Sequence, residues 1–199
     1  MGNNYVITIG REYGSGGFEI GKKVAEKLGI AFYDKNLIDA AAERSNIHID
    51  LLHKADERTA NPFTNPFTHP GYEAGTVNDR LFWIQSEVIR ELADKETCVI
   101  IGRCADFILR DRENVLNIFI QAPLADRIAR ITEKYLIEIP SEAKKEVLRN
   151  DKLRRSYYQF YTDSKWGGRD HKDLVINSSV LGIDGTVDFI KDFVERKFK

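Results

Sequence analysis

Short apolar runs alternate along this chain with longer segments in which apolar residues recur every three or four positions. Residues 5–9 form a β-branched run that ends before a glycine cluster. In 19–28, Ile20, Val24 and Leu28 are spaced four residues apart. A short β-branched run is typical of a buried strand, and the four-residue spacing is typical of an amphipathic helix. The chain therefore begins with a predicted strand, a glycine loop and a helix.

The same two patterns predict four more strands and six more helices. Strands are expected at 30–33, 97–101, 116–120 and 173–176. Helices are expected at 35–43, 47–55, 77–92, 125–135, 141–161 and 185–198. Strands that alternate with helices indicate an α/β fold with a mostly parallel five-stranded sheet, and ligands of such folds bind beyond the carboxyl ends of the strands.

The segment 56–78 interrupts this alternation. It holds three of the five prolines and repeats the sequence Asn-Pro-Phe-Thr at 61–64 and 65–68. Proline cannot lie in a helix interior without breaking it, and loops longer than about 12–15 residues are usually functional or disordered. We expect a long inserted loop within one domain that spans 1–199, and the sequence leaves open a homodimer formed through it.

Composition and charge narrow the classes of function. Hydrophobic residues make up 42% and charged residues 31%, and 30 Lys+Arg against 31 Asp+Glu give a net charge of -1. Without a positive excess, general binding to a nucleic acid polymer is disfavoured. No apolar run approaches the ~20 residues of a membrane-spanning helix, the first residues lack the features of a signal peptide, and only two cysteines occur. We expect a cytoplasmic protein that does not contact a membrane.

The glycine cluster, which contains Arg11 and Gly14-Ser15-Gly16-Gly17, lies between a strand and a helix. Backbone amides and the helix N-terminus bind phosphate at such a place, although a tight turn without a ligand has the same pattern. The strict pattern G-x-x-x-x-G-K-[ST] is not met, because Arg11 stands at the first glycine and Gly17 at the lysine. Another cation must replace that lysine, and Arg11, Lys22 and Lys23 are the local candidates. The dinucleotide pattern G-x-G-x-x-G fits less well, because Glu19 stands at its last glycine.

Arginines gather in three further places. Arg103 follows a predicted buried strand, where a charge needs either a ligand anion or a structural partner such as Asp34 or Asp106. Arg127 and Arg130 share one helix face, and Arg154 and Arg155 lie on the next long helix; these could clamp phosphates or simply form a solvated face. Aromatic residues concentrate nearby and could stack a base or pack: Tyr157, Tyr158, Phe160, Tyr161 and Trp166.

Four motifs occur in order: I-T-I-G-R-E-Y-G-S-G-G, L-G-I-A-F-Y-D-K-N-L-I, V-I-I-G-R-C-A-D and L-V-I-N-S-S. With them the chain resembles the cytidylate-kinase-like family of P-loop proteins over about residues 5–195. The resemblance implies a five-stranded parallel sheet, an acceptor-binding insert and a helical lid at about 125–165. It also implies transfer of the γ-phosphoryl of ATP, with Mg²⁺, to CMP or dCMP.

The resemblance assigns roles to residues that match its motifs. Arg11 and 14–17 would contact the ATP phosphates. Asp34, Arg103 and Asp106 would contact the acceptor. The lid would supply Arg127, Arg130, Arg154 and Arg155. Two positions depart from the family pattern: Asn36 replaces a glycine, and Cys104 separates Arg103 from the next carboxylate.

Two other functions fit the same residues. Gly17 stands at the lysine position of the loop and is followed by Phe18 and Glu19 in place of Ser or Thr, which suits a nucleotide-binding regulator without turnover. The missing acceptor-segment glycine suits a kinase for a different small acceptor. The sequence does not identify the metal ligands.

Overall fold

The computed structural model describes residues 4–34 and 77–198. Within them, five parallel strands form one sheet in the order β2-β3-β1-β4-β5. The strands are β1 (Val6–Arg11), β2 (Ala31–Tyr33), β3 (Cys98–Ile101), β4 (Val115–Gln121) and β5 (Leu174–Asn177). This confirms the predicted parallel α/β sheet, with strand bounds shifted by one or two residues.

Six helices accompany the sheet in the described part of the chain. They are α1 (Gly17–Leu28), α4 (Val77–Lys95), α5 (Ala105–Ile108), α6 (Leu124–Tyr135), α7 (Pro140–Thr162) and α8 (Ser178–Phe198). The sequence pattern missed the single-turn helix α5. It also missed the start of α8, which bends at Gly182, where φ is 68°. The predicted helices 35–43 and 47–55 and most of the predicted loop 56–78 lie outside the described residues, and α4 already begins at Val77.

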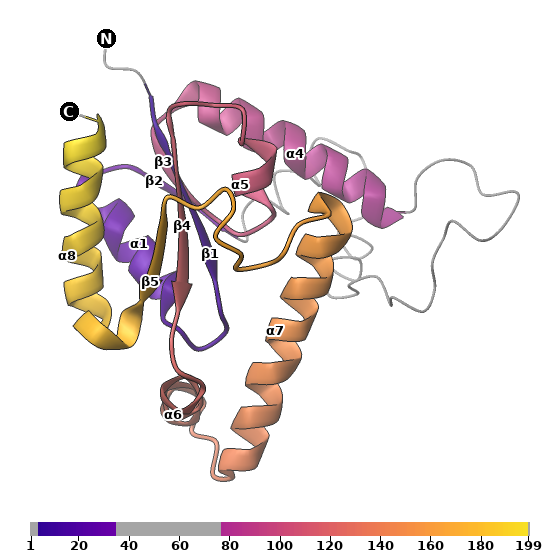
Figure 1. Cartoon of the computed structure of the whole chain (residues 1–199), viewed down its shortest axis with the longest axis vertical. Coiled ribbons are helices and arrows are strands. Elements are labelled where there is room, and N and C mark those ends of the chain that lie inside the picture. The colour runs from indigo at the N-terminus through magenta and orange to yellow at the C-terminus, as the bar shows by residue number, and fades with distance from the viewer. Residues whose placement is uncertain (1–3, 35–76, 199) are drawn as a thin grey trace, which may run out of the picture.

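The sheet lies between two layers of helices (Figure 1). On one face, Ile20 and Val24 of α1 and Ile190 of α8 pack against alternate side chains of the central strands. On the other face, α4, α5 and the C-terminal turns of α7 form a second apolar cluster, which includes Ile89 and Tyr158. All four residues of β3 are buried, as expected for a parallel strand covered on both faces. Because all five strands are parallel, their carboxyl ends lie at the same end of the sheet, and the chain leaves the core there.

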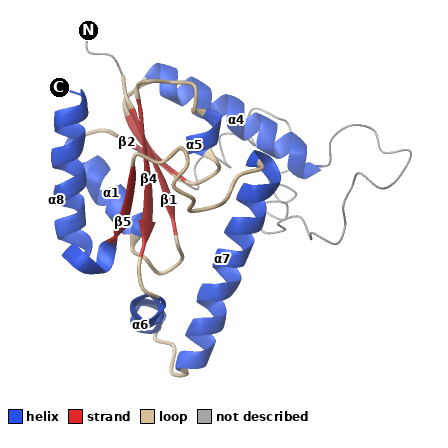
Figure 2. Ribbon diagram, viewed as in Figure 1, coloured by secondary structure: helices blue, strands red, loops and turns tan. Residues whose placement is uncertain are grey.

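The helices α6 and α7 extend beyond that end of the sheet and cross each other, with α6 seen nearly end-on beside the N-terminal turns of α7 (Figure 2). A small core of their own holds them together, formed by Ile131 of α6 with Ala143 and Val147 of α7. Tyr13, from the loop after β1, packs against this core. The region predicted as a lid, about 125–165, consists mainly of these two helices and packs against the glycine loop, and its role as a lid stays a prediction. Among the described residues, no helix combines the length and the apolar character needed to cross a bilayer.

Candidate active site

The loop between β1 and α1 needs glycine at two positions. Gly14 and Gly16 both have φ of 80°, a left-handed conformation that glycine adopts without steric cost. A Cβ on Gly14 would lie 2.8 Å from the carbonyl oxygen of Arg127, and one on Gly16 would lie 2.2 Å from Cδ1 of Ile183. The loop is thus pressed between α6 and α8, which fixes its backbone amides before any ligand binds.

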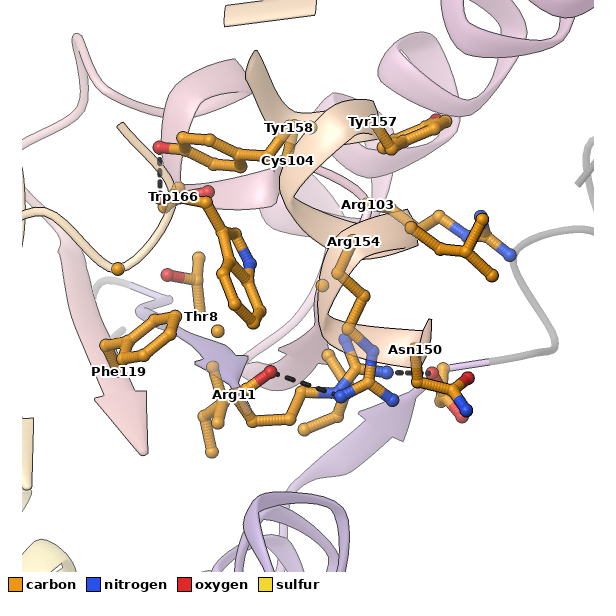
Figure 3. A pocket seen from close by; sticks show the side chains of 18 of the residues that line it. Thr8, Arg11, Arg103, Cys104, Phe119, Asn150, Arg154, Tyr157, Tyr158 and Trp166 are labelled. Carbon is orange, nitrogen blue, oxygen red and sulfur yellow. Dashed lines mark hydrogen bonds and ion pairs between the residues drawn. The ribbon is translucent and has the colours of Figure 1, made fainter. Parts of the chain in front are cut away.

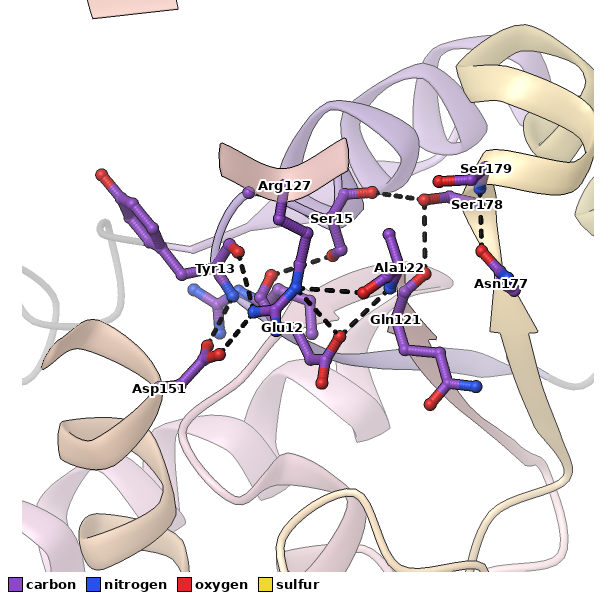
Figure 4. A network of polar contacts seen from close by, with 12 residues as sticks. Glu12, Tyr13, Ser15, Gln121, Ala122, Arg127, Asp151, Asn177, Ser178 and Ser179 are labelled. Carbon is purple, nitrogen blue, oxygen red and sulfur yellow. Dashed lines mark hydrogen bonds and ion pairs between the residues drawn. The ribbon is translucent and has the colours of Figure 1, made fainter. Parts of the chain in front are cut away.

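Hydrogen bonds from side chains also hold the glycine loop in place (Figure 4). The Ser178 hydroxyl, at the start of α8, donates to the carbonyl oxygen of Ser15 at 2.6 Å. The Ser15 hydroxyl donates to the carbonyl oxygen of Glu12 at 2.9 Å. The Glu12 carboxylate accepts from the amide of Ala122 at 3.1 Å. The residue types at 12, 15 and 178 therefore shape the loop through side chains that the sequence analysis had not linked.

Arg127, on α6, joins this loop to α7. Its guanidinium donates to the Asp151 carboxylate at 2.5 Å and to the carbonyl oxygens of Tyr13 and Ala122 at 3.2 and 3.0 Å. Its Nε also lies 3.4 Å from the Glu12 carboxylate. The side chains of Arg127 and Asp151 are only 8% and 7% exposed. In this structure Nε and Nη1 of Arg127 contact protein oxygens, so the guanidinium joins the glycine loop to α7, and its contact with a phosphate stays a prediction.

Two other predicted lid arginines reach the glycine loop itself. Arg130 Nη1 donates to the carbonyl oxygen of Gly14 at 2.5 Å. Arg154 Nη1 donates to the carbonyl oxygen of Arg11 at 3.2 Å, and its guanidinium lies 5.3 Å from the ring centre of Tyr13. Burial lowers the pKa of Arg154, although an arginine starts high enough to stay charged at neutral pH. A partly desolvated guanidinium attracts an anion more strongly than a solvated one does.

A cavity of 580 Å³ opens at the carboxyl ends of β1 and β3, below α7 (Figure 3). Two carboxylates line it, those of Asp34 and Asp106. Five cationic side chains also line it, so positive charge is in excess by three among the described residues. They are Arg11, Arg103, Arg149, Arg154 and Lys172. Such a cavity suits a ligand that carries more than one negative charge.

Arg103 enters this cavity from a strained turn. Gly102, Arg103 and Cys104 all have positive φ, at 73°, 54° and 55°. For a residue other than glycine the left-handed conformation costs roughly 1–2 kcal/mol, and such strain clusters at functional sites. The turn is closed by hydrogen bonds from the Gly102 amide to Ile9 and from Ala105 back to Gly102. Arg103 then lies 6.0 Å from the ring centre of Tyr157.

The carboxylates considered as structural partners of Arg103 contact other cations. Asp34 lies 3.8 Å from Arg11. Asp106 contacts Lys172, whose side chain is 3% exposed, and accepts from the Tyr158 hydroxyl at 2.9 Å. Lys172 had no motif to mark it, and only the fold brings it under α7. The sequence analysis missed it for that reason.

The predicted aromatic cluster divides in two. Tyr157, Tyr158 and Trp166 line the cavity, and the edge of Phe119 meets Trp166 with ring centres 5.3 Å apart. Tyr161 instead stacks on Phe82 of α4 at 4.0 Å, which is core packing. The predicted lid residue Arg155 also lies outside the cavity lining, with its guanidinium 5.8 Å from the Trp166 ring centre.

Two candidates for the missing loop lysine lie elsewhere. Lys22 pairs with Glu26 at 3.9 Å, and Lys23 pairs with Glu19 and Asp184 at 3.1 and 2.8 Å, all on the outer face of α1 and α8. Neither lysine lines the cavity. Of the three candidates named from the sequence, Arg11 alone does.

The described residues contain neither a cluster of metal-binding side chains nor a cysteine that is ionised at neutral pH. No group of three or more histidine, cysteine or acidic side chains is arranged to hold a metal ion in 4–34 and 77–198. Cys98 and Cys104 are free and buried. Burial raises the pKa of Cys98 to about 12 and also raises that of Cys104, so both are thiols at neutral pH. A redox role, which needs a thiolate, is disfavoured.

Comparison with known proteins finds relatives of this chain. A cytidylate kinase of Archaeoglobus fulgidus is 27% identical over 196 residues, which cover 96% of this chain and 95% of that protein. A cytidylate kinase of Methanococcus aeolicus is 29% identical over 111 residues, covering 55% of this chain. That second alignment spans 62% of the Methanococcus protein, less than two thirds of its length.

Solved structures share the fold. An uncharacterized protein from Eubacterium ventriosum superposes with a TM-score of 0.74 at 28% identity, over 96% of this chain and 99% of that one. A shikimate kinase from Bacteroides thetaiotaomicron superposes with a TM-score of 0.55 at 16% identity, over 96% of this chain and 98% of that one. The second likeness shows the P-loop kinase fold alone. The cytidylate kinase-like family matches residues 6–180, which include all five described strands and the helices α6 and α7, and the chain therefore belongs to that family.

Proposed function

We propose that this protein transfers the γ-phosphoryl of ATP to a nucleoside monophosphate, and that the acceptor is CMP or dCMP. The observation that carries the proposal is the cavity beside the glycine loop, with its excess of positive charge and its aromatic wall. A nucleoside monophosphate has the matching features, a phosphate of about two negative charges and a flat base. Family membership supports the same reaction class.

The residues divide into a donor group and an acceptor group. The amides of 14–17 would bind the ATP phosphates at the N-terminus of α1, where the helix dipole favours an anion. Arg130 and Arg154 reach this loop from the lid. Arg103, on the cavity side, would bind the acceptor phosphate, and the rings of Tyr157 and Trp166 could stack its base.

Phosphoryl transfer asks the protein mainly for positioning and for charge on the transferred oxygens. The cavity and the glycine loop meet at the end of β1, so an acceptor phosphate in the cavity would lie beside a donor phosphate on the loop. Arg154 is shared between them, since it lines the cavity and bonds the loop at Arg11. A lid that carries Arg154 can therefore deliver charge and exclude water in one closing movement. Arg127 would act as a positioning residue that keeps loop and lid in register.

Mg²⁺ needs few protein ligands in such sites, because it keeps water and binds substrate phosphates with only one or two carboxylates. Asp34 supplies one carboxylate in the cavity, so the residues present fit this arrangement. The position where P-loops carry a magnesium-binding hydroxyl is Phe18 here. When bound, Mg²⁺ would neutralise charge on the β- and γ-phosphates, and Asp34 would hold it.

The proposal is tested by titrating ATP with Mg²⁺ into the purified protein and then assaying ADP formation with a panel of acceptors. The panel holds CMP, dCMP, UMP, AMP and GMP, together with shikimate and gluconate as acceptors that lack a nucleotide. Transfer that depends on CMP or dCMP supports the proposal. Tight ATP binding without transfer to any of them favours a regulator, and transfer to a non-nucleotide favours a different small-molecule kinase. Absence of ATP binding would contradict the phosphate-binding loop itself.

A further inference from the structure

Gly17 has no room for a side chain, and the obstacle is Arg11. A Cβ on Gly17 would lie 2.5 Å from Cβ of Arg11, 3.1 Å from its Cγ and 3.2 Å from Cβ of Ile120. A Cβ is fixed by the backbone, so a rotamer change of Arg11 cannot relieve this contact. Gly17 is the first residue of α1 and has no positive φ, so its backbone conformation does not require glycine. The side chain of Arg11 is the reason for glycine here.

Side chains at positions 11 and 17 exclude each other, and the strict P-loop pattern carries its side chain at the second position where this chain carries it at the first. That pattern places glycine where Arg11 stands and lysine where Gly17 stands. In the present geometry, a residue with a Cβ at position 17 requires a residue without one at position 11. The departures from the pattern at positions 11 and 17 therefore have one cause.

The Arg11 side chain runs from the loop to the acceptor side. A Cβ on Gly102 would lie 2.2 Å from Arg11 Nη1, so the guanidinium passes directly over the end of β3. It lies 3.8 Å from Asp34 and lines the cavity, and its side chain is 19% exposed. Figure 3 shows it beside Arg154, at the boundary of loop and cavity. Arginine can bind two phosphate oxygens at once through its planar fork.

We infer that Arg11 and Gly17 are an exchanged pair, in which Arg11 supplies from the first loop position the cation that the lysine supplies in a strict P-loop. Placed there, the guanidinium contacts the phosphoryl group that passes between donor and acceptor. This inference rests on the proposed kinase function for its catalytic half. Its steric half, the exclusion between positions 11 and 17, stands independently of any activity.

The steric half is tested by a double-mutant cycle read as melting temperature. Gly17→Ala should lower Tm by about 5 °C in the wild-type background, as expected for overpacking in a chain of this length. In the Arg11→Gly background the same change should leave Tm unchanged or raise it, because alanine favours a helix. Gly21→Ala is the matched control, since a Cβ there would meet Cδ1 of Ile101, 2.5 Å away, and not Arg11. It should lower Tm equally in both backgrounds, and an equal effect of Gly17→Ala in both would overturn the exclusion.

The catalytic half is tested by turnover with the best acceptor. Arg11→Gly should lower kcat at least 100-fold, a loss typical of one preorganised charge contact. The double variant Arg11→Gly with Gly17→Lys should recover at least tenfold over Arg11→Gly alone. Retention of more than half the activity by Arg11→Gly, or no recovery in the double variant, would overturn the exchange of roles.

If the wild-type protein transfers phosphoryl to no acceptor, the proposed function fails and the inference is then read from ATP binding. Arg11→Gly must in that case weaken the affinity for ATP at least tenfold by titration calorimetry. An unchanged affinity would overturn the cationic role of Arg11 in a protein without turnover. The Tm cycle gives the same answer in either case.

Discussion

The strained turn at the end of β3 gives a prediction in which two variants differ in stability but lose the same activity. Arg103 has φ of 54°, and it lines the cavity. Both Arg103→Ala and Arg103→Gly remove the guanidinium, but only glycine relieves the left-handed strain of roughly 1–2 kcal/mol. Glycine also gives the unfolded chain more conformational freedom, which lowers stability by about 0.4–1 kcal/mol and offsets part of the relieved strain. Arg103→Gly should therefore be more stable than Arg103→Ala by about 0.5–1 kcal/mol.

The comparison cancels the contacts that both variants lose, including the cation–π contact with Tyr157. Urea denaturation of the two proteins measures the difference in the free energy of unfolding, which corresponds to a Tm higher by about 1–4 °C for glycine. Both variants should lower kcat/KM for the acceptor at least tenfold while ATP affinity stays within about twofold. An Arg103→Gly protein less stable than Arg103→Ala would refute the strain argument. Equal losses of ATP and acceptor binding would show that Arg103 supports the fold and does not bind the acceptor.

Further predictions concern the lid and the core. Arg127→Ala should destabilise the protein by about 3–5 kcal/mol, because it leaves the Asp151 carboxylate buried and unpaired, and the double change Arg127→Met with Asp151→Leu should recover most of that loss in urea denaturation. Arg154→Ala should lower kcat more than Arg154→Lys does, with steady-state kinetics as the readout, because lysine keeps the charge but not the fork that reaches the loop. Burial raises the pKa of the Cys98 thiol to about 12 in the folded protein, whereas the pKa of a cysteine in the unfolded chain is about 8.5. The stability that the neutral thiol contributes is therefore fully present below about pH 8.5 and is lost as the pH rises toward 12. Between pH 8.5 and 10 the loss should be about 1–2 kcal/mol, and a Cys98→Ala protein should show a smaller alkaline loss in the same denaturation series.

The sequence determined the fold class because its signals are local. The β-branched runs and four-residue periodicities place all five strands and the helices α1, α4, α6 and α7 close to where they lie. The glycine cluster after the first strand identified the loop for the same reason, since positive φ and close approach are demands on single residues. The membership predicted from four ordered motifs is confirmed by the family match over 6–180.

Local signals could not decide what each arginine contacts. Arg127 and Arg130 share a helix face in the sequence, yet one is enclosed by Asp151 and Glu12 and the other rests on the glycine loop. The difference is set by α7, which packs across α6 and brings Asp151 to Arg127 from 24 residues away. Sequence spacing carries no information on such a partner.

The same limit holds for the cavity. Lys172 contacts Asp106 across 66 residues, and the loop that carries it has no motif. The reason for glycine at position 17 also depended on tertiary structure. In the sequence, Gly17 stands where the strict pattern has lysine; in the fold, the Arg11 side chain occupies the space that a side chain at position 17 would need. The sequence by itself determined the elements and the loop, because propensity and periodicity act over a few residues. Only the tertiary structure decided which charges meet, because contacts between distant segments are fixed by packing.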